Sequence, residues 1–246
     1  MDPAAEKYYS WSGYNYVMDS PLLLVDPDGK GVAGDYYDKN GNHLGSDGKK
    51  DGKIYMVNGG KFNVKDFQSG GKYEDNHAAL NEDLGPGYSV DEVDMDSEIG
   101  LLARIGFAEF RGSNDAEQQA GMDITLNRVE SDKFPNTLEG VIADEGQYSS
   151  LEEGDPNKPF FDNPVSQLKS STVNERAWVK SVSNAIKVLR GGKRGISNGA
   201  VLYYSPRSMS PRYSKPDWNF SNLQQVDIKG ARTSHIKAYK YKGGGG

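Results

Sequence analysis

The chain has 246 residues, of which 35% are hydrophobic, and its formal net charge is −6. This length suits one large domain or a modest domain with an appendage, and the 30 glycines indicate a packed part beside a loop-rich part. No basic run resembles a nucleic-acid footprint, so nucleic acid is not expected as a partner. The absence of cysteine excludes disulfides and thiolate chemistry, and no apolar run approaches the roughly 20 residues of a membrane span.

The first 34 residues are predicted to be irregular and are rich in aromatic side chains. Asp19-Ser20-Pro21-Leu22 is followed by a tight turn at Asp26-Pro27-Asp28-Gly29. This pair of segments resembles the C-terminal end of the Rhs/YD-repeat core, a family in which a variable toxin domain usually follows the repeat shell. The resemblance implies that residues 1–34 are an Rhs-core-like segment and that the rest of the chain is delivered as a toxin.

Residues 35–95 are predicted to form a small β module and a linker. Short aromatic strands flank Asn-Gly turns, a pattern typical of β-hairpins. One hairpin is predicted at 36–44 and a second at 53–64, with the return strand of the second at 61–64. The acidic stretch 76–96, punctuated by Gly and Pro, is interpreted as a connection.

From residue 96 onward hydrophobic side chains recur at helical spacing, and strands return near the C-terminus. Asn114 followed by Glu117 is typical of a capping box, which explains Glu117 without a catalytic role. The predicted helices span residues 97–111, 114–129 and 172–190, and the predicted strands span 200–205, 225–229 and 235–241. The fold class is therefore α+β, with a mainly helical domain and a small antiparallel sheet at 96–242. A loop-rich β segment precedes this domain, and a glycine tail at 243–246 follows it.

Glu109 lies near the end of the first predicted helix, on the same stripe as Leu102 and Ile105. An acid on an apolar face must be paired, or it must hold its proton at neutral pH. A carboxylic acid that stays protonated is the proton donor that cleavage of a glycosidic bond requires. The alternative is a helix-end carboxylate that pairs with Arg104 or Arg111, and position alone leaves both interpretations open.

The helical half also carries several ordered segments of distinctive sequence. They are Ala108-Glu109-Phe110-Arg111-Gly112, Leu126-Asn127-Arg128-Val129, residues 134–142, Gly146-Gln147-Tyr148-Ser149, residues 200–204, and His235 with Tyr239. Together they resemble the SleB-type cell-wall hydrolases over roughly residues 98–241, with an altered stretch at 205–222. The resemblance implies a lysozyme-like fold and cleavage between N-acetylmuramic acid and N-acetylglucosamine, by a lytic transglycosylase or a muramidase. It also places the family's conserved acid at Glu109.

Six residues are candidates for binding the sugar, and five of them lie in two short segments. Gln147, Tyr148 and Ser149 lie in a predicted loop, where polar groups beside an aromatic ring can hold a saccharide. Tyr203 and Tyr204 alternate across a predicted strand, so one is expected to face the core and the other the substrate.

The remaining candidates have two interpretations each or a supporting role. Trp218 is either a sugar platform or a core plug. Asn127 is expected to be hydrogen-bonded, either orienting Glu109 or tying two loops together. Arg111 and His235 are candidate orienting residues. The three histidines show no ligand spacing, so no metal and no cofactor are predicted.

The two resemblances together predict an antibacterial effector that cleaves peptidoglycan in the periplasm of a target cell. Its expected partners are peptidoglycan glycan strands, the Rhs or secretion-system delivery components, and a cognate immunity protein. One alternative is a non-catalytic wall-binding or effector-loading module, which would bind sacculi without releasing fragments. Another is an amidase, which would release free stem peptides.

Overall fold

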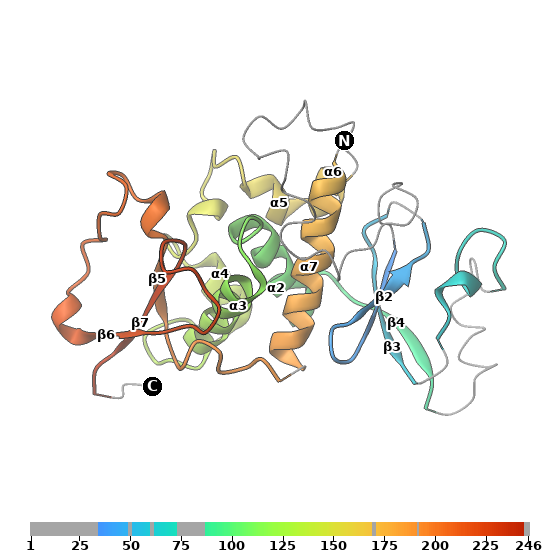
Figure 1. Cartoon of the computed structure of the whole chain (residues 1–246), viewed down its shortest axis with the longest axis horizontal. Coiled ribbons are helices and arrows are strands. Elements are labelled where there is room, and N and C mark those ends of the chain that lie inside the picture. Colours follow the sequence, from blue (N-terminus) through green and yellow to red (C-terminus); the bar gives the residue numbers. More distant parts are fainter. Residues whose placement is uncertain are drawn as a thin grey trace.

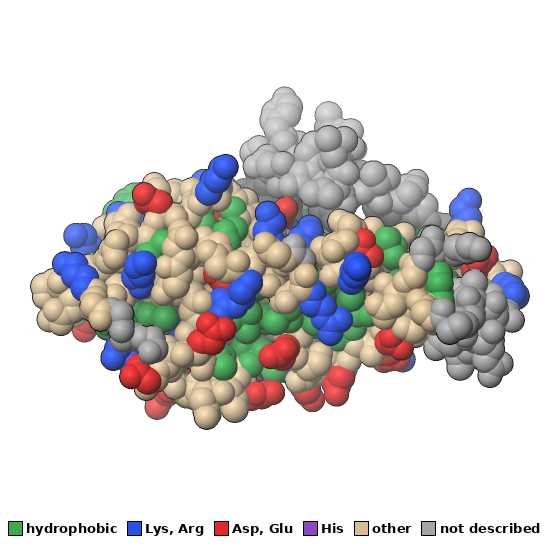
Figure 2. Space-filling model, turned by 90° about the horizontal axis from the view of Figure 1, so that it is seen from below, with side chains coloured by type: hydrophobic (Ala, Val, Ile, Leu, Met, Phe, Trp, Pro, Cys, Tyr) green, Lys and Arg blue, Asp and Glu red, His purple; other side chains and the backbone are tan. Residues whose placement is uncertain are grey.

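A four-stranded sheet, a group of helices and a three-stranded sheet follow one another along the long axis of the molecule (Figure 1). The computed structural model describes residues 34–48, 51–59, 62–72, 87–168, 171–190 and 192–243. The predicted Rhs-like segment lies outside the described residues except for Gly34, and the glycine tail does so except for Gly243. Seen from below, Asp and Glu side chains gather along one long edge, while Lys and Arg spread over the middle and the left end (Figure 2).

The first sheet has the strand order β2-β1-β3-β4. Its strands are β1 (Asp35–Asp38), β2 (His43–Ser46), β3 (Ile54–Asn58) and β4 (Ser89–Glu92). β1 pairs antiparallel with β2, which confirms the first predicted hairpin, and it pairs parallel with β3. A loop-rich β segment therefore precedes the helices, as predicted.

The second predicted hairpin is wrong. β3 pairs with β1 and β4 rather than with residues 61–64, and Val64 begins a short 3-10 helix, η3 (Val64–Asp66). The Asn63 side chain accepts a hydrogen bond from the Lys65 amide at 3.2 Å, so Asn63 caps that helix. Phe62 packs its ring on Tyr36, 5.0 Å between centroids, so its apolar character serves packing instead of a ladder.

β4 lies inside the stretch that the sequence pattern assigns to a connection. Only Val90 of its four residues is buried, so the alternation that identifies a strand is missing. The strand forms because its backbone pairs with β3 through a register that sets Val90 opposite Val57.

The structure describes six α-helices. They are α2 (Glu98–Glu109), α3 (Asp115–Val129), α4 (Leu138–Ala143), α5 (Lys158–Asp162), α6 (Pro164–Leu168) and α7 (Thr172–Leu189). α2, α3 and α7 confirm the three predicted helices. The other three were not predicted because each has only five or six residues, too few for a periodic pattern. None of the described helices has the length and hydropathy of a membrane span.

The main core lies where α2 packs against α7. Phe107 of α2 meets Trp178 of α7 edge-on, 5.5 Å between ring centroids. Leu102 and Ile105 are fully buried in the same cluster, which confirms the predicted apolar stripe of α2. Tyr37 of the first sheet joins this cluster too, so the sheet and the helices share one core.

α3 is buried on nearly all sides, as its two apolar stripes predicted. Asn114 and Glu117 form the predicted capping box at its start. Gly121 permits a close contact, because a Cβ atom there would lie 2.2 Å from the Phe110 ring. The ring of Phe110, the residue after Glu109, therefore rests directly on the α3 backbone.

The second sheet is antiparallel, with the order β5-β7-β6. Its strands are β5 (Leu202–Tyr204), β6 (Leu223–Val226) and β7 (Lys237–Tyr241), close to the predicted positions. Ala238 of β7 lies opposite Tyr203 of β5 and packs with Ala120 and Ile124 of α3. One face of this sheet thus covers α3.

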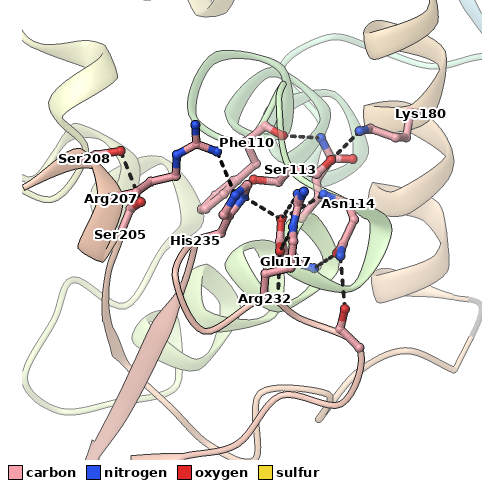
Figure 3. A network of polar contacts seen from close by, with 12 residues as sticks. Phe110, Ser113, Asn114, Glu117, Lys180, Ser205, Arg207, Ser208, Arg232 and His235 are labelled. Atoms are coloured by element: carbon pink, nitrogen blue, oxygen red, sulfur yellow. Dashed lines mark hydrogen bonds and ion pairs between the residues drawn. The ribbon is translucent and has the colours of Figure 1, made fainter. Parts of the chain in front are cut away.

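A buried carboxylate ties the segment before β7 to the start of α3 (Figure 3). Glu117 is 1% exposed and accepts hydrogen bonds from the Asn114 amide and from the backbone and guanidinium of Arg232, all at 2.8–2.9 Å. His235 adds its Nδ1, 3.4 Å from Glu117 Oε2. Burial raises the pKa of Glu117, but the hydrogen bonds from Arg232 and Asn114 outweigh burial and lower this pKa to about 2.

This depressed pKa predicts an acid-sensitive stability. Because the folded state binds the Glu117 proton more weakly than the unfolded state, the stabilisation is present above the ordinary pKa of 4.5 and is lost as pH falls towards 2. Glu117→Gln should lower the free energy of unfolding at pH 7 by about 1–3 kcal/mol, and by progressively less at pH 4 and pH 3. Urea unfolding followed by circular dichroism measures this. Glu139→Gln, at an exposed position in α4, is the control, and its free energy of unfolding should change with pH as that of the wild type does. If the difference between Glu117→Gln and wild type were the same at every pH, the prediction would be contradicted.

Candidate active site

Glu109 is the last residue of α2, and its side chain is half-buried. The Tyr203 hydroxyl, on β5, donates a hydrogen bond to Glu109 Oε1 at 3.0 Å. The carboxylate therefore has a fixed donor on one oxygen and is still partly exposed. A group held in this way can meet a substrate without losing its orientation.

The two arginines beside Glu109 have other partners. Arg104 pairs with Asp96 at 3.1 Å. Arg111 donates to Asn157 Oδ1 at 3.2 Å, and its guanidinium carbon lies 3.6 Å from the centre of the Phe160 ring. Burial lowers the pKa of Arg111. Within the described part of the chain neither guanidinium forms an ion pair with Glu109, so the alternative interpretation of Glu109 as a helix-end ion-pair partner is wrong.

Tyr203 is held from both sides. Its ring lies 5.4 Å from that of Phe110 and 5.5 Å from the guanidinium carbon of Arg128. Burial and the negative charge of Glu109 raise the pKa of Tyr203 well above its ordinary value. Tyr203 therefore remains a hydrogen-bond donor throughout the pH range in which proteins are folded.

Arg128 is a buried cation in the Leu126–Val129 segment, and the sequence pattern predicts no separate role for it. It is 3% exposed, and its Nε donates to the Val201 carbonyl oxygen at 2.8 Å, just before β5. Its Nη1 has no hydrogen-bond partner among the described residues. Rings of Phe134 and Tyr148 lie 5.5 and 5.3 Å from its guanidinium carbon. Apart from Phe134, its surroundings come from segments far apart in the chain, so no local pattern indicates them.

Tyr148 is buried rather than at the surface. It is 2% exposed, and its hydroxyl lies 2.7 Å from Thr125 Oγ1, which in turn donates to the Gly121 carbonyl oxygen. Burial raises the pKa of Tyr148. With 2% of its surface exposed and its ring beside the Arg128 guanidinium, Tyr148 offers no surface for a sugar, which corrects the expectation that it binds substrate.

Its two neighbours are differently placed. Gln147 is half-buried and Ser149 is exposed at the start of the 3-10 helix η4 (Ser149–Leu151). Sugar binding by these two residues stays a prediction.

Tyr203 and Tyr204 face opposite sides of β5, as the alternation predicts. Tyr204 packs on the outer face of the sheet with Tyr239, 6.2 Å between ring centroids. Trp218 meets both rings edge-on, at 5.8 and 6.1 Å. Tyr203 therefore reaches Glu109, while Trp218 fits the interpretation as a core plug.

The two remaining candidates tie loops together. Asn127 donates to Ser197 Oγ at 2.9 Å and to the Ala200 carbonyl oxygen at 2.8 Å, so it fixes the chain that leads into β5. His235 belongs to the Glu117 network (Figure 3). Neither side chain hydrogen-bonds Glu109 directly. In the described ranges no three His, Asp or Glu side chains are grouped so as to hold a metal ion.

Part of the chain is similar in sequence to known cell wall enzymes. Residues 112–231 match the family model described as Cell Wall Hydrolase. Two curated relatives from Bacillus cereus, both described as spore cortex-lytic enzyme, are 33% identical to this chain over 86 residues, which cover 35% of this chain. The match spans 32% of the length of each relative, and no solved structure matches significantly. The chain thus carries a region similar to cell wall hydrolases, and Glu109 lies just before it.

Proposed function

We propose that this protein cleaves the glycosidic bond between N-acetylmuramic acid and N-acetylglucosamine in peptidoglycan, with Glu109 as general acid and then general base. The observation that carries the proposal is the Glu109 carboxylate itself. It is half-buried, it is not used in an ion pair among the described residues, and Tyr203 orients it at 3.0 Å. The adjoining match to Cell Wall Hydrolase supports the substrate class.

The reaction needs one proton carrier. Protonated Glu109 gives its proton to the bridging oxygen as the bond from that oxygen to the muramic anomeric carbon breaks. The 2-acetamido group of the substrate can stabilise the resulting cation, so no second carboxylate is required. The Glu109 carboxylate, still hydrogen-bonded by Tyr203, then takes a proton from an attacking hydroxyl. If that hydroxyl is the muramic C6 hydroxyl, the product is an anhydro ring; if it belongs to water, the product is a reducing end.

Replacing the proton carrier tests the proposal. Glu109→Gln should keep the fold and lower release of soluble muropeptides from purified sacculi by at least about 100-fold, the usual share of a general acid. Glu98→Gln, exposed at the other end of α2, is the matched control and should retain activity. Mass spectrometry of the products identifies anhydro or reducing ends. Free stem peptides would indicate an amidase, binding without soluble products would indicate a wall-binding module, and either result would overturn the proposal.

Removing one hydroxyl tests the orientation of Glu109. Tyr203→Phe should lower kcat by about 10-fold or more, because a hydrogen bond to a charged group is lost, and KM should change little. Tyr204→Phe, on the opposite face of β5, should leave kcat unchanged. An unchanged kcat in Tyr203→Phe would argue against this role.

We also propose that the protein is an antibacterial effector that acts in the periplasm of a target cell and is neutralised by a cognate immunity protein in its producer. The Rhs-like sequence at 1–34 supports delivery. Directing the chain to the periplasm of a Gram-negative host with an added secretion signal should lyse the cells, whereas the same chain kept in the cytosol, or exported Glu109→Gln, should not. Equal toxicity from the cytosol would point to a target other than the wall.

A further inference from the structure

Basic and acidic residues are unevenly distributed along the chain, which the net charge of −6 does not show. Residues 192–243 hold ten Lys and Arg against two Asp, whereas the whole chain holds 29 Lys and Arg against 35 Asp and Glu. The rest of the chain therefore carries 19 basic against 33 acidic side chains, and the C-terminal segment alone has a formal charge of +8. A division of this size creates a directional field.

The basic segment forms one end of the molecule. It contains β5, β6, β7 and their connections, which Figure 1 places at the opposite end from the first sheet. Lys and Arg side chains spread over this end in Figure 2. Its β5 also supplies Tyr203 to Glu109. The positive end therefore adjoins the candidate proton carrier.

Most of this positive charge is not neutralised within the protein. Arg194 pairs with Asp123 and Glu130, and Arg232 pairs with Glu117. The other eight basic side chains form no ion pair with any residue that the structure describes. We call them the basic end surface: Lys193, Arg207, Arg212, Lys215, Lys229, Lys237, Lys240 and Lys242.

The surroundings leave this surface open to an anion. Six of its eight side chains are exposed, and the other two are half-buried. The Arg207 Nη1 lies 2.8 Å from His235 Nε2, but burial lowers the pKa of His235, so the ring brings no negative charge and little positive charge. Tyr213, 63% exposed, lies between Arg212 and Lys215 in sequence and presents an aromatic ring among the cations. Cations interleaved with an exposed ring suit an anionic saccharide polymer.

We propose that the basic end surface binds the carboxylates of the peptide stems on peptidoglycan. This inference rests on the proposed function, because it assigns the substrate side chain that accompanies the cut sugar. Each stem is attached to the lactyl group of a muramic ring. It is the bridging oxygen on the anomeric carbon of this ring that Glu109 would protonate. A strand placed for cleavage therefore carries its stem carboxylates beside the sugar ring that Glu109 would contact, and β5 supplies the Tyr203 that orients Glu109. The rest of the chain, with 19 basic against 33 acidic side chains, attracts the same carboxylates less.

Binding of an inactive protein tests the inference independently of cleavage. In a Glu109→Gln background, the pair Arg212→Gln with Lys229→Gln should weaken co-sedimentation with purified sacculi by about 3- to 10-fold at low salt. The difference should vanish at high salt, where surface charges are screened. The control pair Lys39→Gln with Lys65→Gln removes the same charge from exposed positions of the N-terminal part and should leave binding unchanged. Thermal unfolding checks that each variant is folded, and Lys193→Gln with Lys215→Gln replaces the test pair if it is not.

Chemical modification of the wall separates the carboxylates from other ligands. Sacculi whose carboxylates are converted to neutral amides should bind the Glu109→Gln protein as weakly as native sacculi bind the double variant, with no salt dependence. The inference fails if amidated sacculi bind as tightly as native ones, if test and control pairs behave alike, or if duplex DNA at equal charge concentration displaces the protein from sacculi. The proposed function has a separate test. If the protein with Glu109 intact released no muropeptides from sacculi, the proposed function would be overturned, whatever the binding measurements show.

Discussion

The polar side chains buried on α3 are the constraint on which the rest of the structure depends. Glu117, Asp123 and Arg128 are each at most 3% exposed, and an unsatisfied buried polar group costs about 1–3 kcal/mol. Their partners come from the C-terminal segment: Arg232 for Glu117, Arg194 for Asp123, and the carbonyl before β5 for Arg128. Satisfying these groups fixes where β5 runs, so Tyr203 can reach Glu109.

The sequence predicts the parts of the fold that depend on local signals, and it does not predict those that depend on partners far away in the chain. α2, α3 and α7 follow from local signals, namely caps and apolar stripes that a single helix contains. The capping box at Asn114 is one such signal, and the structure contains it. The return strand predicted at 61–64 failed because the turn chemistry is local, whereas the choice of β1 and β4 as partners of β3 is not. Short helices such as α5 are not predicted for a related reason, since five residues are too few to show a periodic pattern.

The candidate site divides in the same way. Glu109 could be singled out because its motif lies within one helix and its apolar neighbours are close in sequence. Its hydrogen bond to Tyr203 spans 94 residues, and the rings around Arg128 come from three separate segments. Tyr148 was misassigned because a loop position suggests exposure, while its hydroxyl is bonded to Thr125 in the core. Burial of a single side chain depends on tertiary contacts with residues far away in the sequence, and a short segment does not reveal those contacts.

Two kinds of electrostatics meet at β5. On its inner face, the Arg128 guanidinium lies 5.5 Å from the Tyr203 ring in surroundings that water barely reaches, where each charge acts strongly and is screened little. On the outside, the basic end surface lies in solvent, where each charge is weak and salt reduces it further. The buried groups orient one carboxylate through Tyr203, whereas the exposed groups can act only on a ligand that brings many charges at once. The proposed substrate, a peptidoglycan strand, combines a single bond that needs a proton with a row of carboxylates beside it. A neutral glycan could contact the buried groups but would gain nothing from the basic end surface. A change in the charge of the wall therefore affects binding to the basic end surface and leaves the chemistry at Glu109 unaffected.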